Sequence, residues 1–255
     1  MYADSLPDIE ISPERMSQKC DKLTAEETTT FRALVGKLNW AVQGSRPDFA
    51  FYVVHFSTKF HDATVNDLLQ LKKCIKKLKE SSSEVMFPVL GCPQSWGITV
   101  FSDAAHANLN AINSTSGHIV FLVGENQRSA PLSWSSNRIK RAVRSSLAAE
   151  ALSMQEGLED AIYHQSILQE LFGKNCASKI EAYTDSKSLI EALNSTKLVD
   201  DKRLRIDIGA IKESIRRNEV NVRWCPGSEQ LANCLTKKGA QSSNLLHVIR
   251  TGHLN

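Results

Sequence analysis

Apolar positions in the first third of the chain recur with the spacing of α-helices. Residues 31–38 place four apolar side chains on one face, and residues 68–78 repeat the pattern. Between them, Pro47 predicts a break, because proline disfavours the helical conformation of the residue before it. This part of the sequence predicts a small, mostly helical segment.

Downstream, the pattern changes to short apolar runs that have strand character. Three such runs follow one another with turn residues between them, at residues 96–104, 117–124 and 130–137. Consecutive strands joined by short turns pair antiparallel, so these runs predict a meander. The change of pattern predicts a helical segment over residues 1–92 and a second domain over residues 93–255.

A long helix is predicted after the meander. Apolar residues from Leu147 to Phe172 recur at alternating steps of four and three, and Gly173 predicts the end of this helix. The elements expected next are a strand over 179–186, a short helix around 189–193, a second helix over 204–215, the strand VNVRWCP and a terminal helix beginning near Ser228. This order predicts an α/β domain whose mixed sheet is flanked by helices.

Composition favours a soluble intracellular protein. A chain of 255 residues with 42% apolar content can bury a full core. Its longest apolar runs are too short for a bilayer and the N-terminus lacks a signal pattern, so we expect neither membrane insertion nor secretion. Six scattered cysteines without a CxxC pair predict neither a zinc site nor a disulfide framework. A reducing compartment is expected, the cytoplasm or alternatively the nucleus.

The net charge of +3 lies entirely in the second domain, because residues 1–92 hold 12 basic and 12 acidic side chains. No acid occurs between Glu125 and Glu150. Basic residues accumulate there instead: Arg128, Arg138, Lys140, Arg141 and Arg144. Such a segment suits a phosphate-facing edge. A solvated basic loop is the alternative, and for a single run it is the more common explanation.

Three carboxylates are candidates for a shared site. Asp103 follows an apolar run and is expected at the end of its strand, and Asp185 is placed in the same way on a later strand. Glu150 lies in the first turns of the long helix among small residues, and it belongs to no capping box. Each acid has an alternative explanation when it is taken singly. Asp103 could form a turn, Asp185 could be a helix N-cap, and Glu150 could be a first-turn acid that interacts with the helix dipole.

Taken together, the three acids indicate a divalent-metal cluster. Two-metal cleavage of a phosphodiester needs hard oxygen ligands gathered around ions about 3.5–4 Å apart, where one ion activates water and the other stabilises the leaving oxygen. Carboxylates that converge from separate elements supply this arrangement.

Several motifs resemble the RNase H domain of copia-type LTR retrotransposon Pol polyproteins and occur in the order of that family. They are SDAAHANLNAINSTSGHIVFLVG, LSWSSNRIKRAVRSSLAAEALSMQEGLEDAIY, AYTDSKSLIEAL, KLVDDKRLRIDIGAIKE and WCPGSEQLANCLTKKGA, and they cover residues 97 to about 250. The upstream segment FRALVGKLNWAVQGSRPDFAFYVVHFSTKF is similar to the thumb and connecting region of the same family's reverse transcriptase. The resemblance implies an RNase H-like fold with a mixed five-stranded sheet.

The resemblance also implies site residues. Three acids of the family that are catalytic and bind metal match Asp103, Glu150 and Asp185. The implied cofactor is Mg²⁺ or Mn²⁺, with two ions if the site is intact. No small-molecule cofactor is expected. The fourth acid of the family lies in a QLAD-x-LTK motif, where this chain has Asn233. Asparagine offers one neutral carbonyl oxygen, so turnover is put in doubt. Asp207 is a candidate substitute, although a salt bridge to an arginine is the favoured interpretation.

By resemblance, the expected function is that of a metal-dependent endoribonuclease cleaving the RNA strand of RNA–DNA hybrids. Its expected partners are the hybrid and the polymerase portion of the same polyprotein. Arg138, Lys140 and Arg144 are the expected nucleic-acid contacts, made to phosphates rather than to bases. The alternative is a catalytically inactive nucleic-acid-binding relic. A transposase or integrase is less favoured, because those sites carry their last acid on a late helix, whereas Glu150 falls between the two aspartates.

Overall fold

The protein was analysed as a computed structural model that describes residues 6–7, 10–81, 84–109, 113–197 and 199–254. The chain forms two compact units, Met1–Glu84 and Val85–Asn255. The predicted boundary after residue 92 lies slightly downstream of this division. The segment between the two positions belongs to the second unit, where the Met86 backbone N–H donates to the Ile249 carbonyl at 2.8 Å.

The first unit is built from helices. They are α1 (Pro13–Ser17), α2 (Ala25–Ser45), α3 (Ala50–Ser57) and α4 (Val65–Glu80). The two helices that the apolar spacing predicts are α2 and α4, and each begins with a capping box, at Thr24 and at Thr64. At the predicted break, the buried Arg46 guanidinium pairs with Asp48 and donates to the Leu78 carbonyl at 3.2 Å. This arginine links the end of α2 to the end of α4. The similarity of this unit to a reverse transcriptase thumb stays a prediction.

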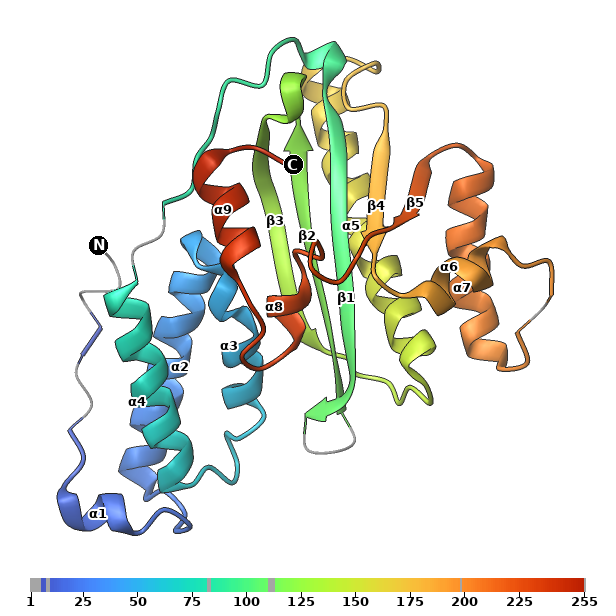
Figure 1. Cartoon of the computed structure of the whole chain (residues 1–255). Coiled ribbons are helices and arrows are strands. Elements are labelled where there is room, and N and C mark those ends of the chain that lie inside the picture. Colours follow the sequence, from blue (N-terminus) through green and yellow to red (C-terminus); the bar gives the residue numbers. More distant parts are fainter. Residues whose placement is uncertain (1–5, 8–9, 82–83, 110–112, 198, 255) are drawn as a thin grey trace. The chain divides into compact units, whose positions relative to one another are not determined.

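The second unit contains a mixed five-stranded sheet in the order β3-β2-β1-β4-β5 (Figure 1). The strands are β1 (Gly97–Leu109), β2 (Asn113–Val123), β3 (Ser129–Arg138), β4 (Ile180–Thr184) and β5 (Val220–Trp224). The first three form the predicted antiparallel meander, while β4 pairs parallel with both β1 and β5. The predicted fold class, an α/β domain with a mixed five-stranded sheet flanked by helices, is confirmed.

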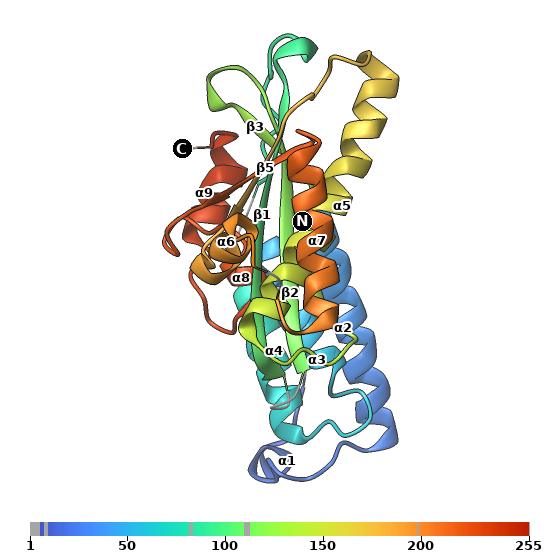
Figure 2. The same ribbon diagram turned by 90° about the vertical axis from the view of Figure 1, so that its right-hand side faces the viewer.

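Helices cover both faces of this sheet. They are α5 (Ser146–Phe172), α6 (Lys187–Asn194), α7 (Lys202–Arg216), α8 (Asn233–Thr236) and α9 (Ser243–Thr251). Seen along the sheet, α5 and α7 lie on one side, while α8 and α9 lie on the other (Figure 2). Among the described residues, no helix is both long enough and apolar enough to cross a bilayer.

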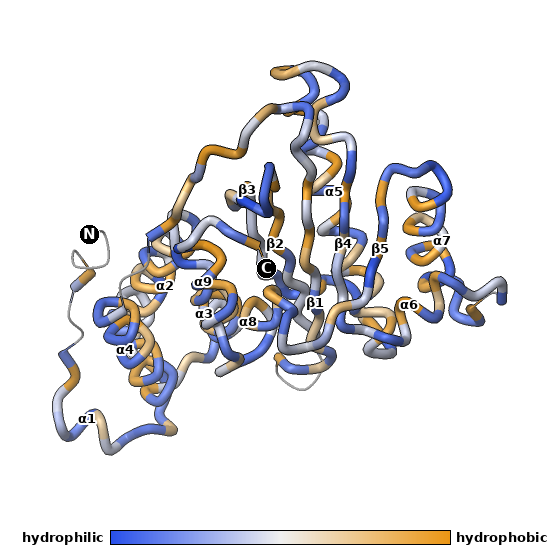
Figure 3. Tube along the Cα trace, turned by 45° about the horizontal axis from the view of Figure 1, so that its top comes forward, coloured by the Kyte–Doolittle hydropathy of each residue, from blue (hydrophilic) through white to orange (hydrophobic). Residues whose placement is uncertain are grey.

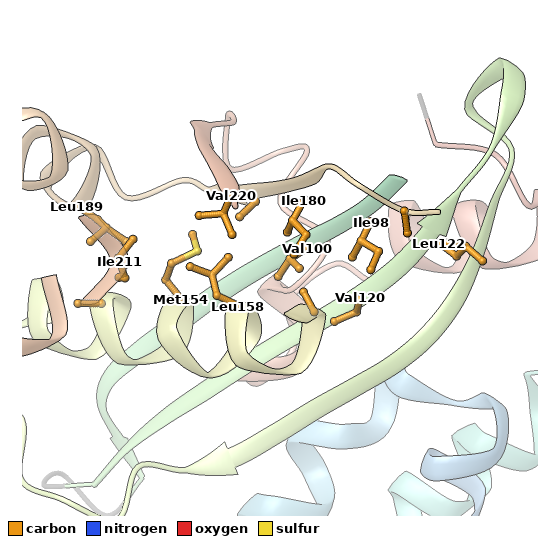
Figure 4. Packing of buried hydrophobic residues seen from close by; sticks show 14 of the residues in the cluster. Ile98, Val100, Val120, Leu122, Met154, Leu158, Ile180, Leu189, Ile211 and Val220 are labelled. Atoms are coloured by element: carbon orange, nitrogen blue, oxygen red, sulfur yellow. The ribbon is translucent and has the colours of Figure 1, made fainter. Parts of the chain in front are cut away.

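The main core lies between α5 and the sheet. Figure 4 shows Met154 and Leu158 of α5 against Val100 and Val120 of the central strands. Hydrophobic and hydrophilic residues alternate along the turns of α7 (Figure 3), and the apolar face of that helix extends the same core through Ile211. Periodicity in the sequence therefore identified most of the buried faces, although Phe172, the last residue of the predicted stripe, is 45% exposed.

The C-terminal region corrects one prediction. A single terminal helix beginning near Ser228 is wrong, because α8 begins only at Asn233, has a single turn and is separated from α9. The buried side chain of Gln230 explains the difference. It donates to the Ser102 carbonyl at 3.0 Å and accepts from the Ala232 backbone N–H at 3.1 Å, so this segment is bound to the sheet instead of continuing a helix.

Candidate metal centre

Asp103 and Asp185 come together because their strands are adjacent and parallel. Phe101 of β1 pairs with Tyr183 of β4, and each aspartate follows that pair by two residues. The expectation that Asp103 ends its strand is wrong, because the antiparallel pairing of β1 with β2 continues past it and places Gly117 directly opposite. Asp103 is consequently not a turn residue.

The start of α5 places Glu150 against the same point of the sheet. The Ser145 hydroxyl caps the helix by accepting from the Ala148 backbone N–H at 3.1 Å. The close approach of α5 depends on Gly157, where a Cβ would lie only 3.0 Å from Val100 Cγ1. One turn after Glu150, the Ser153 hydroxyl donates to the Asp103 carbonyl at 2.7 Å, which ties the helix to β1.

The ligand oxygens of Asp103, Glu150 and Asp185 lie within 4.8 Å of one another. In the part of the chain that the structure describes, no other three His, Cys, Asp or Glu residues gather in this way. Asp103 is fully buried, Glu150 is 8% exposed and Asp185 is half-buried. Asp185 is not an N-cap, because Ser186 caps α6 by accepting from the Leu189 N–H. The geometry thus favours the shared site over the separate explanations.

The electrostatics of the cluster favour a bound cation. Burial, together with the charges of Asp103 and Asp185, raises the pKa of Glu150 to about 9, although Lys237 and the Ala104 N–H act in the opposite direction. Burial likewise raises the pKa of Asp103. Glu150 Oε2 is buried and has no hydrogen-bond partner among the described residues. Buried carboxylate oxygens that lack hydrogen-bond partners are suitable ligands for a divalent cation such as Mg²⁺ or Mn²⁺.

Asn233 is connected to the cluster through Lys237. The Lys237 ammonium donates to Asn233 Oδ1 at 2.7 Å and to Asp103 Oδ1 at 3.0 Å. The other oxygen of Asp103 accepts from the Thr236 hydroxyl. Sequence reasoning missed both Thr236 and Lys237, although both stand in the motif QLANCLTK. The available signal was the spacing of four residues between Asn233 and Lys237, because side chains four residues apart in a helical turn lie next to each other.

Asp207 does not replace the missing fourth acid. It lies on α7 and forms an ion pair with Arg141 of the loop that follows β3, as the favoured interpretation predicts. It is absent from the carboxylate cluster.

The three predicted nucleic-acid contacts have different surroundings. Arg138 is the last residue of β3 and Lys140 follows it, both exposed and without an ion pair among the described residues. Arg144 instead lines a surface pocket together with Asp200 and Asp201. Backbone N–H groups, first that of Leu204, lower the pKa of Asp201, and the charge of Arg144 acts in the same direction. Of these three residues, Arg144 is therefore the one with acidic groups beside it in the part of the chain that the structure describes.

No family model matches the chain. Its homologues are retrovirus-related Pol polyproteins from Arabidopsis thaliana transposons. The protein from transposon RE1 is 29% identical over 228 residues, which are 89% of this chain. The protein from transposon RE2 is 28% identical over 213 residues, which are 83% of this chain. The chain spans 15% and 14% of these relatives. An N-terminal RNase H domain from Mycobacterium tuberculosis is similar in structure, with a TM-score of 0.40 and 18% identity over 56% of this chain and 91% of that one.

Proposed function

We propose that this chain, a homologue of one section of retrotransposon Pol polyproteins, is a metal-dependent endoribonuclease that cleaves the RNA strand of RNA–DNA hybrids. The observation that carries the proposal is the convergence of ligand oxygens of Asp103, Glu150 and Asp185 within 4.8 Å of one another. One oxygen of Glu150 is buried there without a hydrogen-bond partner among the described residues. The similarity to retrovirus-related Pol polyproteins supports the substrate, because copying RNA into DNA passes through an RNA–DNA hybrid.

The three acids would hold Mg²⁺ or Mn²⁺. A divalent cation bound there supplies an activated water and stabilises the negative charge on the leaving oxygen. The protein contributes the positioning. Thr236 holds one oxygen of Asp103, Ser153 holds its backbone carbonyl, and burial keeps bulk water away from Glu150.

Phosphates of the hybrid would meet the exposed basic side chains at the end of β3 and just after it. Arg138 and Lys140 are the main candidates, while Arg144 is proposed as a weaker contact because acidic residues lie beside it. The polymerase portion of the polyprotein is the proposed protein partner. All six cysteines are free, which suits a reducing compartment such as the cytoplasm or the nucleus.

The test is cleavage of a labelled RNA, annealed to DNA, by the purified full chain with Mg²⁺ or Mn²⁺. We expect weak cleavage that Asp185→Asn abolishes, and no cleavage of the same RNA as a single strand. Glu170→Gln is the matched control, because it removes an exposed acid near the opposite end of α5 from Glu150. Cleavage that survives Asp185→Asn would refute the assignment.

A catalytically inactive nucleic-acid-binding relic is the second candidate. It is favoured by Asn233, which leaves the centre one negative charge short and binds Lys237 instead. Hybrid binding without cleavage, by both the parent chain and Asn233→Asp, would establish the relic.

A further inference from the structure

We propose that the Lys237 ammonium occupies one of the two cation positions of the acidic centre, so that the chain binds a single divalent cation between Asp103, Glu150 and Asp185. The inference rests on the proposed function, because it concerns the same site. It specifies how many ions the site takes and which side chain limits that number.

The contacts of Lys237 are those of a bound cation. Its Nζ lies 3.0 Å from Asp103 Oδ1 and 2.7 Å from Asn233 Oδ1. The amide of Asn233 is held in this orientation because its Nδ2 donates to the Gly227 carbonyl at 2.8 Å. The carbonyl oxygen at the position of the missing acid therefore faces the ammonium group.

A second divalent ion would need oxygen atoms that are already engaged. One oxygen of the fully buried Asp103 accepts from Thr236 and the other accepts from Lys237. The carbonyl oxygen of Asn233 also accepts from Lys237. Glu150 Oε2, by contrast, has no hydrogen-bond partner among the described residues, so this oxygen remains open to the one divalent ion that the site takes.

The balance of charge points the same way. When ionised, the three acids of the cluster carry three negative charges, which one divalent ion and one ammonium group neutralise. A second divalent ion would leave a net positive charge in a buried site, which is unfavourable at low effective dielectric. An aspartate at position 233 without the lysine would instead carry the fourth negative charge that two divalent ions require.

The test counts Mn²⁺ ions bound to the full chain by isothermal titration calorimetry, without nucleic acid. We expect one ion for the parent chain and two for the double variant Asn233→Asp/Lys237→Met. Lys237→Met alone should bind its first ion roughly tenfold more tightly, because a like charge is removed from the site. Lys174→Met is the matched control, since it removes an exposed lysine beyond the far end of α5, and it should bind one ion with parental affinity.

The outcomes separate this inference from the function on which it rests. Two ions in the parent chain would overturn the inference and leave the proposed nuclease intact, and so would one ion in a double variant that keeps the parental circular dichroism spectrum. If the parent bound none but Lys237→Met bound an ion, the ammonium would block the whole centre and the single-ion inference would be wrong. Binding by neither protein would remove the metal centre and the inference together. If the double variant does not fold, two ions in the parent chain would still overturn the inference, and so would an unchanged affinity of Lys237→Met for its first ion.

Discussion

Gly117 lies directly opposite Asp103 in the β1–β2 ladder, and α8 packs into the space that its missing side chain leaves. A Cβ at this position would lie 2.8 Å from Leu235 Cβ and from Thr236 Cγ2. The glycine therefore allows α8 to approach the sheet closely enough for Thr236 and Lys237 to reach Asp103.

Replacing this glycine should damage both stability and the metal centre. We expect Gly117→Ala to lower the free energy of unfolding by about 1–3 kcal/mol, as overpacking of a core usually does, and to weaken Mn²⁺ binding. Urea unfolding and calorimetry measure the two effects. Gly209→Ala is the control, because nothing lies within 4 Å of the added Cβ on α7, and it should be neutral or stabilising. If Gly117→Ala were as stable as the parent chain, α8 would be able to move away from the sheet without loss of stability.

The raised pKa of Glu150, about 9 against an ordinary 4.5, predicts an unusual dependence of stability on pH. Between these values the folded protein keeps a proton that the unfolded chain has lost. The free energy of unfolding of the cation-free protein should therefore fall as pH rises from about 5 to 9, by up to about 1.4 kcal/mol per pH unit from this group. Urea unfolding in a chelator checks this slope, and Glu150→Gln should remove it. Equal slopes for the parent and Glu150→Gln would contradict the prediction.

The same proton must leave when a divalent cation binds. Mn²⁺ affinity should consequently increase from pH 6 to pH 9, and the heat of binding should depend on the ionisation enthalpy of the buffer. Calorimetry in two buffers of different ionisation enthalpy measures the released proton. In Glu150→Gln this part of the pH dependence should be absent.

Restoring the fourth acid should increase catalysis. We expect Asn233→Asp to raise the rate of hybrid cleavage by about tenfold or more, because it returns a negative charge to the centre and draws Lys237 away from Asp103. Single-turnover kinetics on a labelled hybrid measure this effect. Asn175→Asp adds the same charge in the exposed loop after α5 and should leave the rate unchanged. A slower rate for Asn233→Asp would mean that the asparagine is part of an adapted site.

Basic residues beyond β3 should contribute unequally to hybrid binding. Arg138→Ala and Lys140→Ala should each lower the slope of log affinity against log salt concentration by about one, because each variant loses one phosphate contact. Arg141→Ala should have a smaller effect, because Asp207 already neutralises its charge. Fluorescence anisotropy at several salt concentrations distinguishes these variants. If all three variants kept the parental slope, the loop would lie outside the interface.

Much of the fold was predictable because its signals are local. The apolar periodicity of α2, α4, α5 and α7 and the helix end at Gly173 each depend on residues within a few turns of one another. The terminal helix expected near Ser228 failed for the opposite reason. Gln230 bonds to Ser102, which is far away in sequence, and this contact overrides local helical preference.

The amino-acid pattern alone pointed to the three acids as candidates, because their alternation with apolar residues is visible in one dimension. The neutral residue at the fourth position was recognised through the resemblance to the family's motif. The meeting of Asp103 with Asp185 required the parallel register of β1 and β4. The role of Lys237 required the fold as well. Its contact with Asp103 joins residues 134 positions apart through a helix that packs over Gly117, and no local pattern encodes that approach.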